Sequence, residues 1–253
     1  MIDVVLLGTG NVATHLFNAF SKSTKVNVTG VYGRTDKKLH YFSKTTTTTT
    51  QIVKLPKADV YIIAVTDDAI AKLASQITFS DKLIVHTSGS VGLDAIPFKK
   101  SGVFYPLQTF SKNVSVDFSE IPICLEATYT EDLHQLHELA KAISNTAHTI
   151  DSKQRKSLHL AAVFVCNFVN HLYDIGYQIT QEHQLPFEIL KPLIKETARK
   201  IENGTPASVQ TGPAKRHDTS TIEQHLRMLP NKTQHELYEL LTKSIQQNTN
   251  NYE

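Results

Sequence analysis

Short apolar runs alternate with amphipathic helical patterns over the first 150 residues of the chain. The run at 59–65 is continuously apolar, which is typical of a strand buried on both faces of a sheet. The pattern predicts strands at 2–7, 26–32, 59–65, 82–86, 102–110, 121–127 and 146–150, and helices at 11–21, 35–43, 67–77 and 131–144. Such alternation indicates parallel βαβ units with right-handed crossovers.

From residue 151 onward only the helical period remains. It predicts helices at 152–182, 187–203, 218–228 and 233–247. The predicted fold is therefore α/β, with an N-terminal doubly wound Rossmann domain (1–150) followed by an all-α C-terminal domain (151–253). The run Thr45–Thr50 carries no packing pattern, and we interpret it as a loop, with an edge strand as the alternative.

Composition narrows the class of protein. A length of 253 residues suits one or two domains, and a net charge of +2 is too small to indicate binding to nucleic acid or to an anionic membrane. We see no apolar run near the ~20 residues of a membrane span, and Asp3 argues against a signal peptide. Cys124 and Cys166 lack metal-ligand spacing, so we expect no metal and a reducing, cytoplasmic location.

The first predicted turn has the form GxGxxA, in Gly8-Thr9-Gly10-Asn11-Val12-Ala13. It follows a strand and opens a helix, which is the context that a dinucleotide-binding turn requires. Gly8 allows the tight turn, Gly10 lets the backbone approach a pyrophosphate, and Ala13 lets the helix pack on the strand. The helix N-terminus then offers free N–H groups to phosphate. A glycine-rich turn in an unrelated fold is the alternative.

The end of the second predicted strand selects the cofactor. NAD sites place a carboxylate there for the ribose 2′-hydroxyl, whereas this strand ends in Gly33-Arg34-Thr35. Arg34 can pair bidentately with a 2′-phosphate, and Thr35 can donate its hydroxyl. We therefore predict NADP as the cofactor. The alternative is that Arg34 is a solvated surface residue.

Three further loops should lie at the carboxyl edge of the sheet, where ligands of doubly wound folds bind. We predict that Thr66 lies near the ribose and nicotinamide, and that Asp67 and Asp68 cap the next helix. In the loop 86–90, Ser88 and Gly89 suit close approach to nicotinamide or substrate, unless this is a simple Ser/Gly turn. In the loop 105–110, the candidates for binding a polar substrate are Gln108 and Thr109.

Several segments together resemble one known family. They are GTGNVA, GRT, AVTDDAI, HTSGS, YPLQTFS, LHLAAVFVCNFVNHLY and TGPAKRHDTSTIEQHL. The chain resembles, over nearly its whole length, Rossmann-like NADP-dependent oxidoreductases whose helical C-terminal domain has no known function. It is more distantly similar to pyrroline-5-carboxylate reductase, ketopantoate reductase and the 6-phosphogluconate dehydrogenase-like superfamily. The resemblance implies an active site between the two domains and a homodimer formed through the helical domain.

The helix at 152–182 carries the candidate proton donor, His159, in an otherwise apolar segment. Asn167 and Asn170 lie within about 80° of it on the helical wheel. His159 and Asn167 are about 12 Å apart along the axis, so they would line different ends of a cleft. The β-hydroxyacid dehydrogenases use a Lys with an Asn four residues later, but Val163 follows His159 at that spacing. A structural histidine is therefore the alternative.

A second candidate segment is Thr211–Asp218, in which a Gly-Pro pair precedes two cations. Lys215 and Arg216 could bind a substrate carboxylate or a phosphate, and Asp218 should cap the next helix. The alternative is a capped turn with solvated charges.

These observations favour an NADP(H)-dependent oxidoreductase that acts on a small carbonyl, hydroxy or imine substrate. The catalytic candidates are His159, as the proton donor, and Asn167, at the other end of the cleft. The substrate would meet the loops at 86–90 and 105–110. A non-catalytic NADP(H)-binding sensor or assembly protein is the competing hypothesis, because the Lys-x-x-x-Asn pair is missing. A purely structural dimer that binds no nucleotide is a weaker one.

Overall fold

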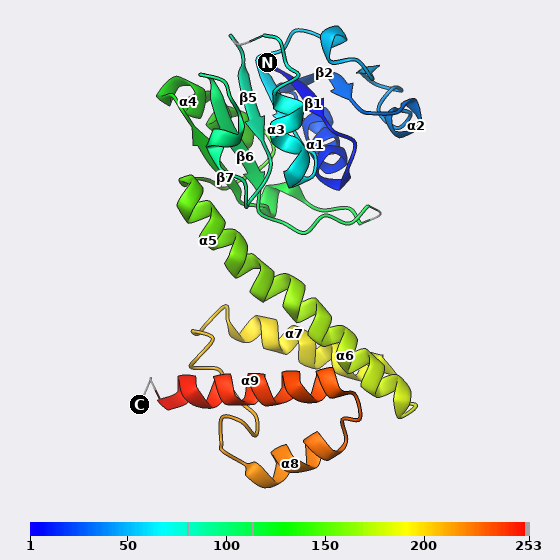
Figure 1. Ribbon diagram of the computed structural model, residues 1–253, viewed down its shortest axis with the longest axis vertical. Helices are drawn as coiled ribbons and strands as arrows, with labels where there is room; N and C mark the ends of the chain where they lie inside the picture. The colour runs from blue at the N-terminus through cyan, green and yellow to red at the C-terminus, as the bar shows by residue number, and fades with distance from the viewer. Residues whose placement is uncertain (80, 113, 251–253) are drawn as a thin grey trace. The chain divides into compact units, whose positions relative to one another are not determined.

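The computed structural model describes residues 1–79, 81–112 and 114–250. The chain forms two compact units, Met1–Cys166 and Asn167–Glu253. Secondary structure becomes purely helical after residue 151, near the predicted domain boundary, but the first unit continues to Cys166. It does so because the first turns of the long helix pack on the sheet through Leu158. Figure 1 labels many of the helices and strands.

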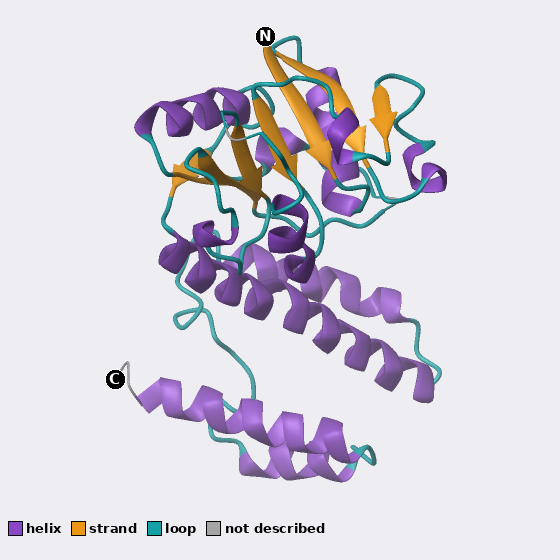
Figure 2. Ribbon diagram, turned by 45° about the horizontal axis from the view of Figure 1, so that its top comes forward, coloured by secondary structure: helices purple, strands orange, loops and turns teal. Residues whose placement is uncertain are grey.

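The first unit contains an eight-stranded sheet in the order β3-β2-β1-β4-β5-β6-β7-β8. This order is that of a doubly wound Rossmann fold, with its switch point between β1 and β4. The strands, drawn as arrows in Figure 2, are β1 (Ile2–Leu7), β2 (Val26–Tyr32), β3 (Thr47–Thr49), β4 (Val60–Ile63), β5 (Leu83–His86), β6 (Ser101–Pro106), β7 (Ile123–Ala127) and β8 (Ala147–Thr149).

Two sequence-based expectations about the strands need correction. β6 and β7 are antiparallel, not parallel, because the described part of the 107–122 connection holds only the short 3-10 turn η3 (Phe118–Glu120) and no crossover helix. Thr47–Thr49 form β3 rather than loop, as the alternative interpretation held. The outer edge of β2 offers unpaired backbone groups to them, and threonine is well suited to a strand.

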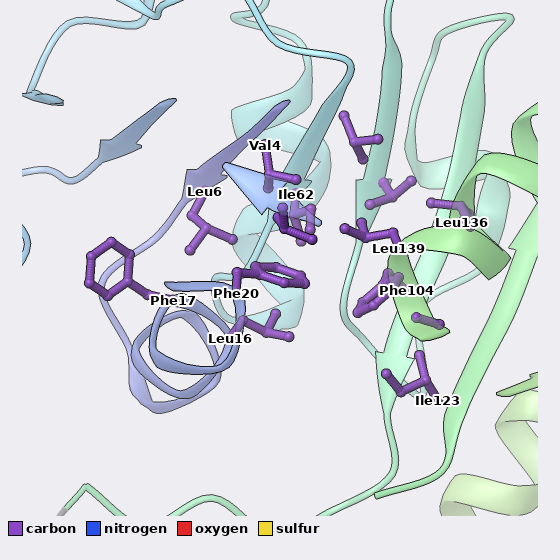
Figure 3. Close-up of a cluster of buried hydrophobic side chains, with 14 of the residues drawn as sticks. Val4, Leu6, Leu16, Phe17, Phe20, Ile62, Phe104, Ile123, Leu136 and Leu139 are labelled. Atoms are coloured by element: carbon purple, nitrogen blue, oxygen red, sulfur yellow. The ribbon is translucent and has the colours of Figure 1, made fainter. Parts of the chain in front are cut away.

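Helices cover both faces of the sheet. α1 (Asn11–Lys22) and α4 (Thr130–Lys141) pack on one face, and α3 (Asp67–Ala74) packs on the other. Alternate residues of β1 serve the two sides, since Val4 and Leu6 join the first cluster and Val5 and Leu7 the second. Figure 3 shows Leu16, Phe17 and Phe20 of α1 in the first cluster, together with Leu136 and Leu139 of α4. The short helix α2 (Asp36–Leu39) follows β2.

A long helix joins the two units. It consists of α5 (Ser152–Ala162), a π-helical segment η4 (Val163–Phe168) and α6 (Val169–Glu182), and the boundary between the units falls within η4. By length and composition alone, Ser152–Glu182 is apolar enough to cross a membrane, contrary to our expectation from the sequence. One such helix is weak evidence for a membrane span, although no residue of its 18-residue apolar window is buried in the structure.

The second unit is helical throughout its regular structure. After α6 it contains η5 (Phe187–Leu190), α7 (Lys191–Lys200), α8 (Thr219–Arg227) and α9 (Lys232–Asn250). Asp218 caps α8 as predicted, since its carboxylate accepts a hydrogen bond from the backbone N–H of Thr221 at 3.1 Å. Among the described residues of this unit, the only apolar residue that is buried is Ala214.

Candidate functional site

The GxGxxA turn lies between the carboxyl ends of β2 and β4. Gly8 has φ = 145°, and a Cβ atom placed on it would lie 2.0 Å from the carbonyl oxygen of Ala64. Its backbone N–H donates to the carbonyl oxygen of Tyr32 at 2.9 Å. Only glycine fits this position, because both the backbone conformation and the approach of β4 exclude a side chain.

Gly10 forms the N-terminal cap of α1, and no side chain caps this helix end. A Cβ atom placed on Gly10 would meet nothing within 4 Å, so the backbone is open at this point. Ala13, one turn later, is fully buried against the sheet, as its predicted packing role requires. The exposed end of α1 therefore presents backbone N–H groups that can bind an anion.

A pocket of about 620 Å³ opens over this turn. Residues of the turn line it, as do Arg34, Thr66 and Gln108 from three other loops. Lys38 and Lys72 add two more cations to the lining. Among the described residues that line the pocket, none is Asp or Glu. The pocket thus joins the exposed N-terminal end of α1 to a cationic wall. Thr35, Ser88 and Thr109, which we predicted as binding residues, are not among its lining.

The loop after β6 is held against the start of α1. The side-chain amide of Asn11 donates to the carbonyl oxygen of Phe110 at 2.8 Å. Nε2 of His15 lies 3.0 Å from the carbonyl oxygen of Ser111, and its ring packs on Phe110 with centroids 5.0 Å apart. These contacts bring Gln108 and Phe110 to the pocket wall. Asn11 therefore positions a loop in addition to standing in the glycine-rich motif.

The loop after β5 is organised by His86 and Ser88. Nδ1 of His86 accepts the backbone N–H of Ser88 at 3.1 Å, so Nε2 donates to the carbonyl oxygen of Gly92 at 3.2 Å. Burial, with a smaller effect of Arg155, lowers the pKa of His86 to about 4. The Ser88 hydroxyl accepts backbone N–H groups from Ser90 and Val91. Ser88 is thus buried in the turn that it supports.

Asp67 contacts the same loop. It begins α3, where a negative charge favours the helix dipole, and its carboxylate accepts a hydrogen bond from the Ser90 hydroxyl. This bond joins the first residue of α3 to the loop after β5. The N-cap of α3 is Thr66, whose side chain makes no capping hydrogen bond, so our expectation that Asp67 and Asp68 cap this helix is wrong: both stand inside its first turn.

His159 meets the β5 loop and β6 within the first unit. The Tyr105 hydroxyl lies 3.1 Å from Nδ1 of His159, and a Cβ atom placed on Gly89 would lie 2.6 Å from the same nitrogen. Tyr105 is buried, and desolvation raises its pKa to about 12. The structure thus brings Gly89 and His159 together, both of which the sequence singled out, and adds Tyr105.

Arg155, which our sequence analysis missed, anchors the start of α5. Its guanidinium pairs with the Glu126 carboxylate, and Nη2 donates to the carbonyl oxygen of Val91 at 2.6 Å. Ser152 also donates to Glu126, through its backbone N–H at 3.0 Å and through its hydroxyl. Arg155 is four residues before His159 and therefore shares its helix face. The ion pair holds that face against the β5 loop.

The remaining predicted site residues belong to the second unit. Asn167 and Asn170 lie in η4 and α6 with exposed side chains, and Lys215 and Arg216 lie in the turn before α8. Their placement beside His159 stays a prediction. In the part of the chain that the structure describes, no cluster of His, Cys, Asp or Glu could hold a metal ion.

Two family models match the chain. Residues 3–89 match the family described as NADP oxidoreductase, coenzyme F420-dependent, and residues 121–245 match a domain of unknown function, DUF2520. A comparison with curated proteins finds no match.

Solved structures give likenesses over the whole chain. A protein from Bacteroides fragilis, provisionally described as an NADP oxidoreductase, is 41% identical, with 97% of this chain and 98% of that chain covered and a TM-score of 0.89. An imine reductase from Myxococcus stipitatus in complex with NADP+ is 12% identical (97% and 92% covered, TM-score 0.68). A pyrroline-5-carboxylate reductase from Coxiella burnetii is 15% identical (99% and 98% covered, TM-score 0.58). The last two likenesses concern the fold alone.

Proposed function

The chain belongs to a family of Rossmann-fold NADP oxidoreductases that carry a C-terminal DUF2520 domain, and from this premise we propose that it is an NADP(H)-dependent oxidoreductase of a small carbonyl, hydroxy or imine compound. NADP(H) would bind in the pocket over the GxGxxA turn. The helix end at Gly10 would bind the pyrophosphate through its backbone N–H groups.

The observation that carries the proposal is the charge of this pocket. Arg34 follows β2 at the place where NAD sites have a carboxylate, and Lys38 and Lys72 line the same pocket. A 2′-phosphate is the group that such a wall favours, since Arg binds phosphate bidentately. This choice of NADP over NAD is our inference from the charge of the lining residues.

The test compares the two dinucleotides in a thermal shift assay, because a ligand of the native state raises the melting temperature by mass action. We expect a larger shift with NADP than with NAD. Replacing Arg34→Ala should weaken NADP binding about tenfold or more, since hydrogen bonds to charged groups contribute about 1.5–3 kcal/mol, and should leave NAD binding nearly unchanged. Arg227→Ala, on exposed α8, is the matched control. A larger shift with NAD would contradict the assignment, and no shift with either would contradict nucleotide binding.

For the chemistry we propose His159 as the group that donates a proton or a hydrogen bond to the reacting oxygen or nitrogen. Bound NADPH would supply the hydride. The β5 loop at Gly89 and the β6 loop at Gln108 would face the substrate, Asn167 and Asn170 would line its other end, and Lys215 and Arg216 would bind an anionic group. The contact of the His159 ring with Gly89 supports the role of His159, because it brings the imidazole to the β5 loop that would face the substrate.

A His159→Ala variant tests this role with a panel of oxo acids and imines. Turnover should be lost while NADPH affinity stays at the wild-type value. Unchanged turnover would contradict the role. If the wild-type protein binds NADPH but oxidises it with no member of the panel, the competing hypothesis of a non-catalytic NADP(H) sensor gains support. The missing Lys-x-x-x-Asn pair, with Val163 four residues after His159, is the observation that favours it.

We further propose a homodimer formed through the helical unit, in the cytoplasm. Apolar side chains of the described part of this unit are exposed, with Ile189 at 65%, Leu193 at 63% and Leu240 at 65%. Burial of apolar surface is the main driving force of folding and association, so exposed apolar side chains of this kind indicate a surface that is buried against a partner. We propose that this partner is a second copy of the chain.

Sedimentation velocity tests the dimer. We expect the wild-type chain to sediment as a dimer and Leu193→Lys to shift it toward monomer, while the neighbouring exposed Lys195→Ala leaves it unchanged. A monomeric wild-type chain would contradict the proposal. If the protein instead floats together with lipid vesicles in a density gradient, a membrane contacts the apolar helix Ser152–Glu182.

A further inference from the structure

Tyr105 contacts His159 and Gly89, and the proposed function gives Tyr105 no role. The three residues come from β6, from the loop after β5 and from α5, so the fold brings together segments distant in sequence. We propose that Tyr105 is a positioning residue, which donates its hydroxyl proton to Nδ1 of His159 and thereby holds the imidazole in the tautomer protonated at Nε2. This inference rests on the proposed role of His159.

The direction of the hydrogen bond follows from the surroundings of Tyr105. Its hydroxyl is 3.1 Å from Nδ1, and among the described residues it has no other hydrogen-bond partner. If Nδ1 carried the proton, the buried phenolic hydrogen would have no acceptor, which is unfavourable. Burial also raises the pKa of Tyr105 to about 12, so the phenol keeps its proton at neutral pH and remains a donor.

Gly89 makes room for this pair. A Cβ atom on Gly89 would lie 2.6 Å from Nδ1 of His159 and 2.8 Å from Cζ of Tyr105, so even an alanine methyl group would push the two rings apart. The two ring centroids are 6.1 Å apart and meet edge to face. The glycine of the HTSGS segment therefore serves the Tyr–His contact, which explains why the smallest residue stands there.

The rest of the unit fixes both partners. Tyr105 lies on β6, between β5 and β7 in the sheet, and is 9% exposed. His159 is held through the Arg155–Glu126 ion pair four residues earlier on α5. With Nδ1 accepting from Tyr105, Nε2 carries the N–H. A neutral imidazole of this kind can donate a hydrogen bond that polarises a substrate oxygen or nitrogen.

The test is nitrogen NMR of the full-length protein labelled with ¹⁵N-histidine, at pH 8, without cofactor. A His159→Gln variant identifies the His159 signals among the 12 histidines. In the wild-type protein we expect one tautomer, protonated on Nε2, with Nδ1 at the chemical shift of a hydrogen-bond acceptor. Tyr105→Phe should move Nδ1 toward a free lone pair and mix the tautomers, as in an exposed histidine such as His148.

The chain offers a matched control, because the second unit has a Tyr–His pair of the same kind. The Tyr238 hydroxyl lies 2.8 Å from Nδ1 of His225. Tyr238→Phe should change the His225 signals and leave those of His159 in place. Gly89→Ala should act like Tyr105→Phe, whereas Gly176→Ala, which meets no atom nearer than 4.0 Å, should act like the wild type.

Two outcomes would overturn the inference: a proton on Nδ1 in the wild-type protein, or the same Nδ1 shift and tautomer in Tyr105→Phe. Because the measurement needs no nucleotide, failure of NADP(H) binding would contradict the proposed function and leave this result standing. Where a substrate of the panel is turned over, Tyr105→Phe should lower kcat about tenfold and leave the KM for NADPH unchanged. A purely structural role of Tyr105 would lower the stability of the protein and leave kcat of the folded enzyme unchanged.

Discussion

The guanidinium of Arg155 is fully buried and pairs with the carboxylate of Glu126, which links α5 to β7 of the sheet. Arg155 also donates to Val91 and Ser152, so one side chain joins the β5 loop, the sheet and the long helix. The same contacts place His159 one turn further along α5. The arrangement ties the stability of the first unit to the geometry of its candidate site.

Removing Arg155 should destabilise the protein strongly, because the Glu126 carboxylate, whose side chain is only 16% exposed, would lose the charge that it pairs with. We expect Arg155→Met to lower the free energy of unfolding by about 3 kcal/mol or more, measured by urea unfolding followed by circular dichroism. Arg199→Met, which breaks an exposed pair with Glu196, is the control and should match the wild type. An Arg155→Met variant as stable as the wild type would show that the pair has no structural role.

The Rossmann half of the fold was predictable because its signals are local. GxGxxA between a strand and a helix, and a strand ending in Arg34, each occupy a few consecutive residues, and the structure puts them in one pocket. Antiparallel β7 was harder to predict, since strand direction depends on how the 107–122 connection returns to the sheet. The homopolymer at Thr45–Thr50 has no pattern, so only its pairing with β2 shows that part of it is a strand.

The part of the candidate site around His159 was harder to predict from the sequence. Arg155 stands in the segment SKQRKSLHL beside Lys153 and Lys156, and nothing local separates the buried cation from the two exposed ones. Tyr105 looks like an ordinary strand residue until β6 and α5 meet. Both roles depend on contacts between segments far apart in the chain, which one sequence does not reveal.

The two glycines of the turn should respond differently to alanine. Gly8→Ala should prevent correct folding, because the methyl group would lie 2.0 Å from the Ala64 carbonyl oxygen at a φ that only glycine favours. Gly10→Ala should fold, with a melting temperature near the wild-type value, yet bind NADP at least about tenfold more weakly, because the methyl group occupies the approach of the pyrophosphate. Circular dichroism and isothermal titration calorimetry separate the two effects. Wild-type NADP affinity in Gly10→Ala would contradict the phosphate site.

Lys38 and Lys37 form a matched pair for testing the cationic wall. They are neighbours on α2 and both exposed, but only Lys38 lines the pocket. Lys38→Ala should weaken NADP binding about three- to fivefold, the effect expected of a solvent-exposed charge, with little change for NAD. Lys37→Ala should bind both dinucleotides like the wild type. Titrations at high salt should remove most of the difference, since screening acts on exposed charges, and an equal loss in both variants would indicate a general charge effect.

His86 should make the stability of the first unit depend on pH. Its pKa is lowered to about 4 in the folded protein, chiefly by burial, against about 6.5 in the unfolded chain. Between these values the unfolded state binds the proton and the folded state does not, so the free energy of unfolding should fall by roughly 3 kcal/mol as the pH drops from about 6.5 to about 4. Above pH 6.5 this group contributes no pH dependence. Urea unfolding at several pH values tests this: His86→Gln should reduce the dependence of the free energy of unfolding on pH between about 4 and 6.5, whatever its effect on stability at pH 7. Replacing the exposed His148 by Gln should leave that dependence unchanged. A slope in His86→Gln equal to that of the wild type would assign the acid sensitivity to other groups.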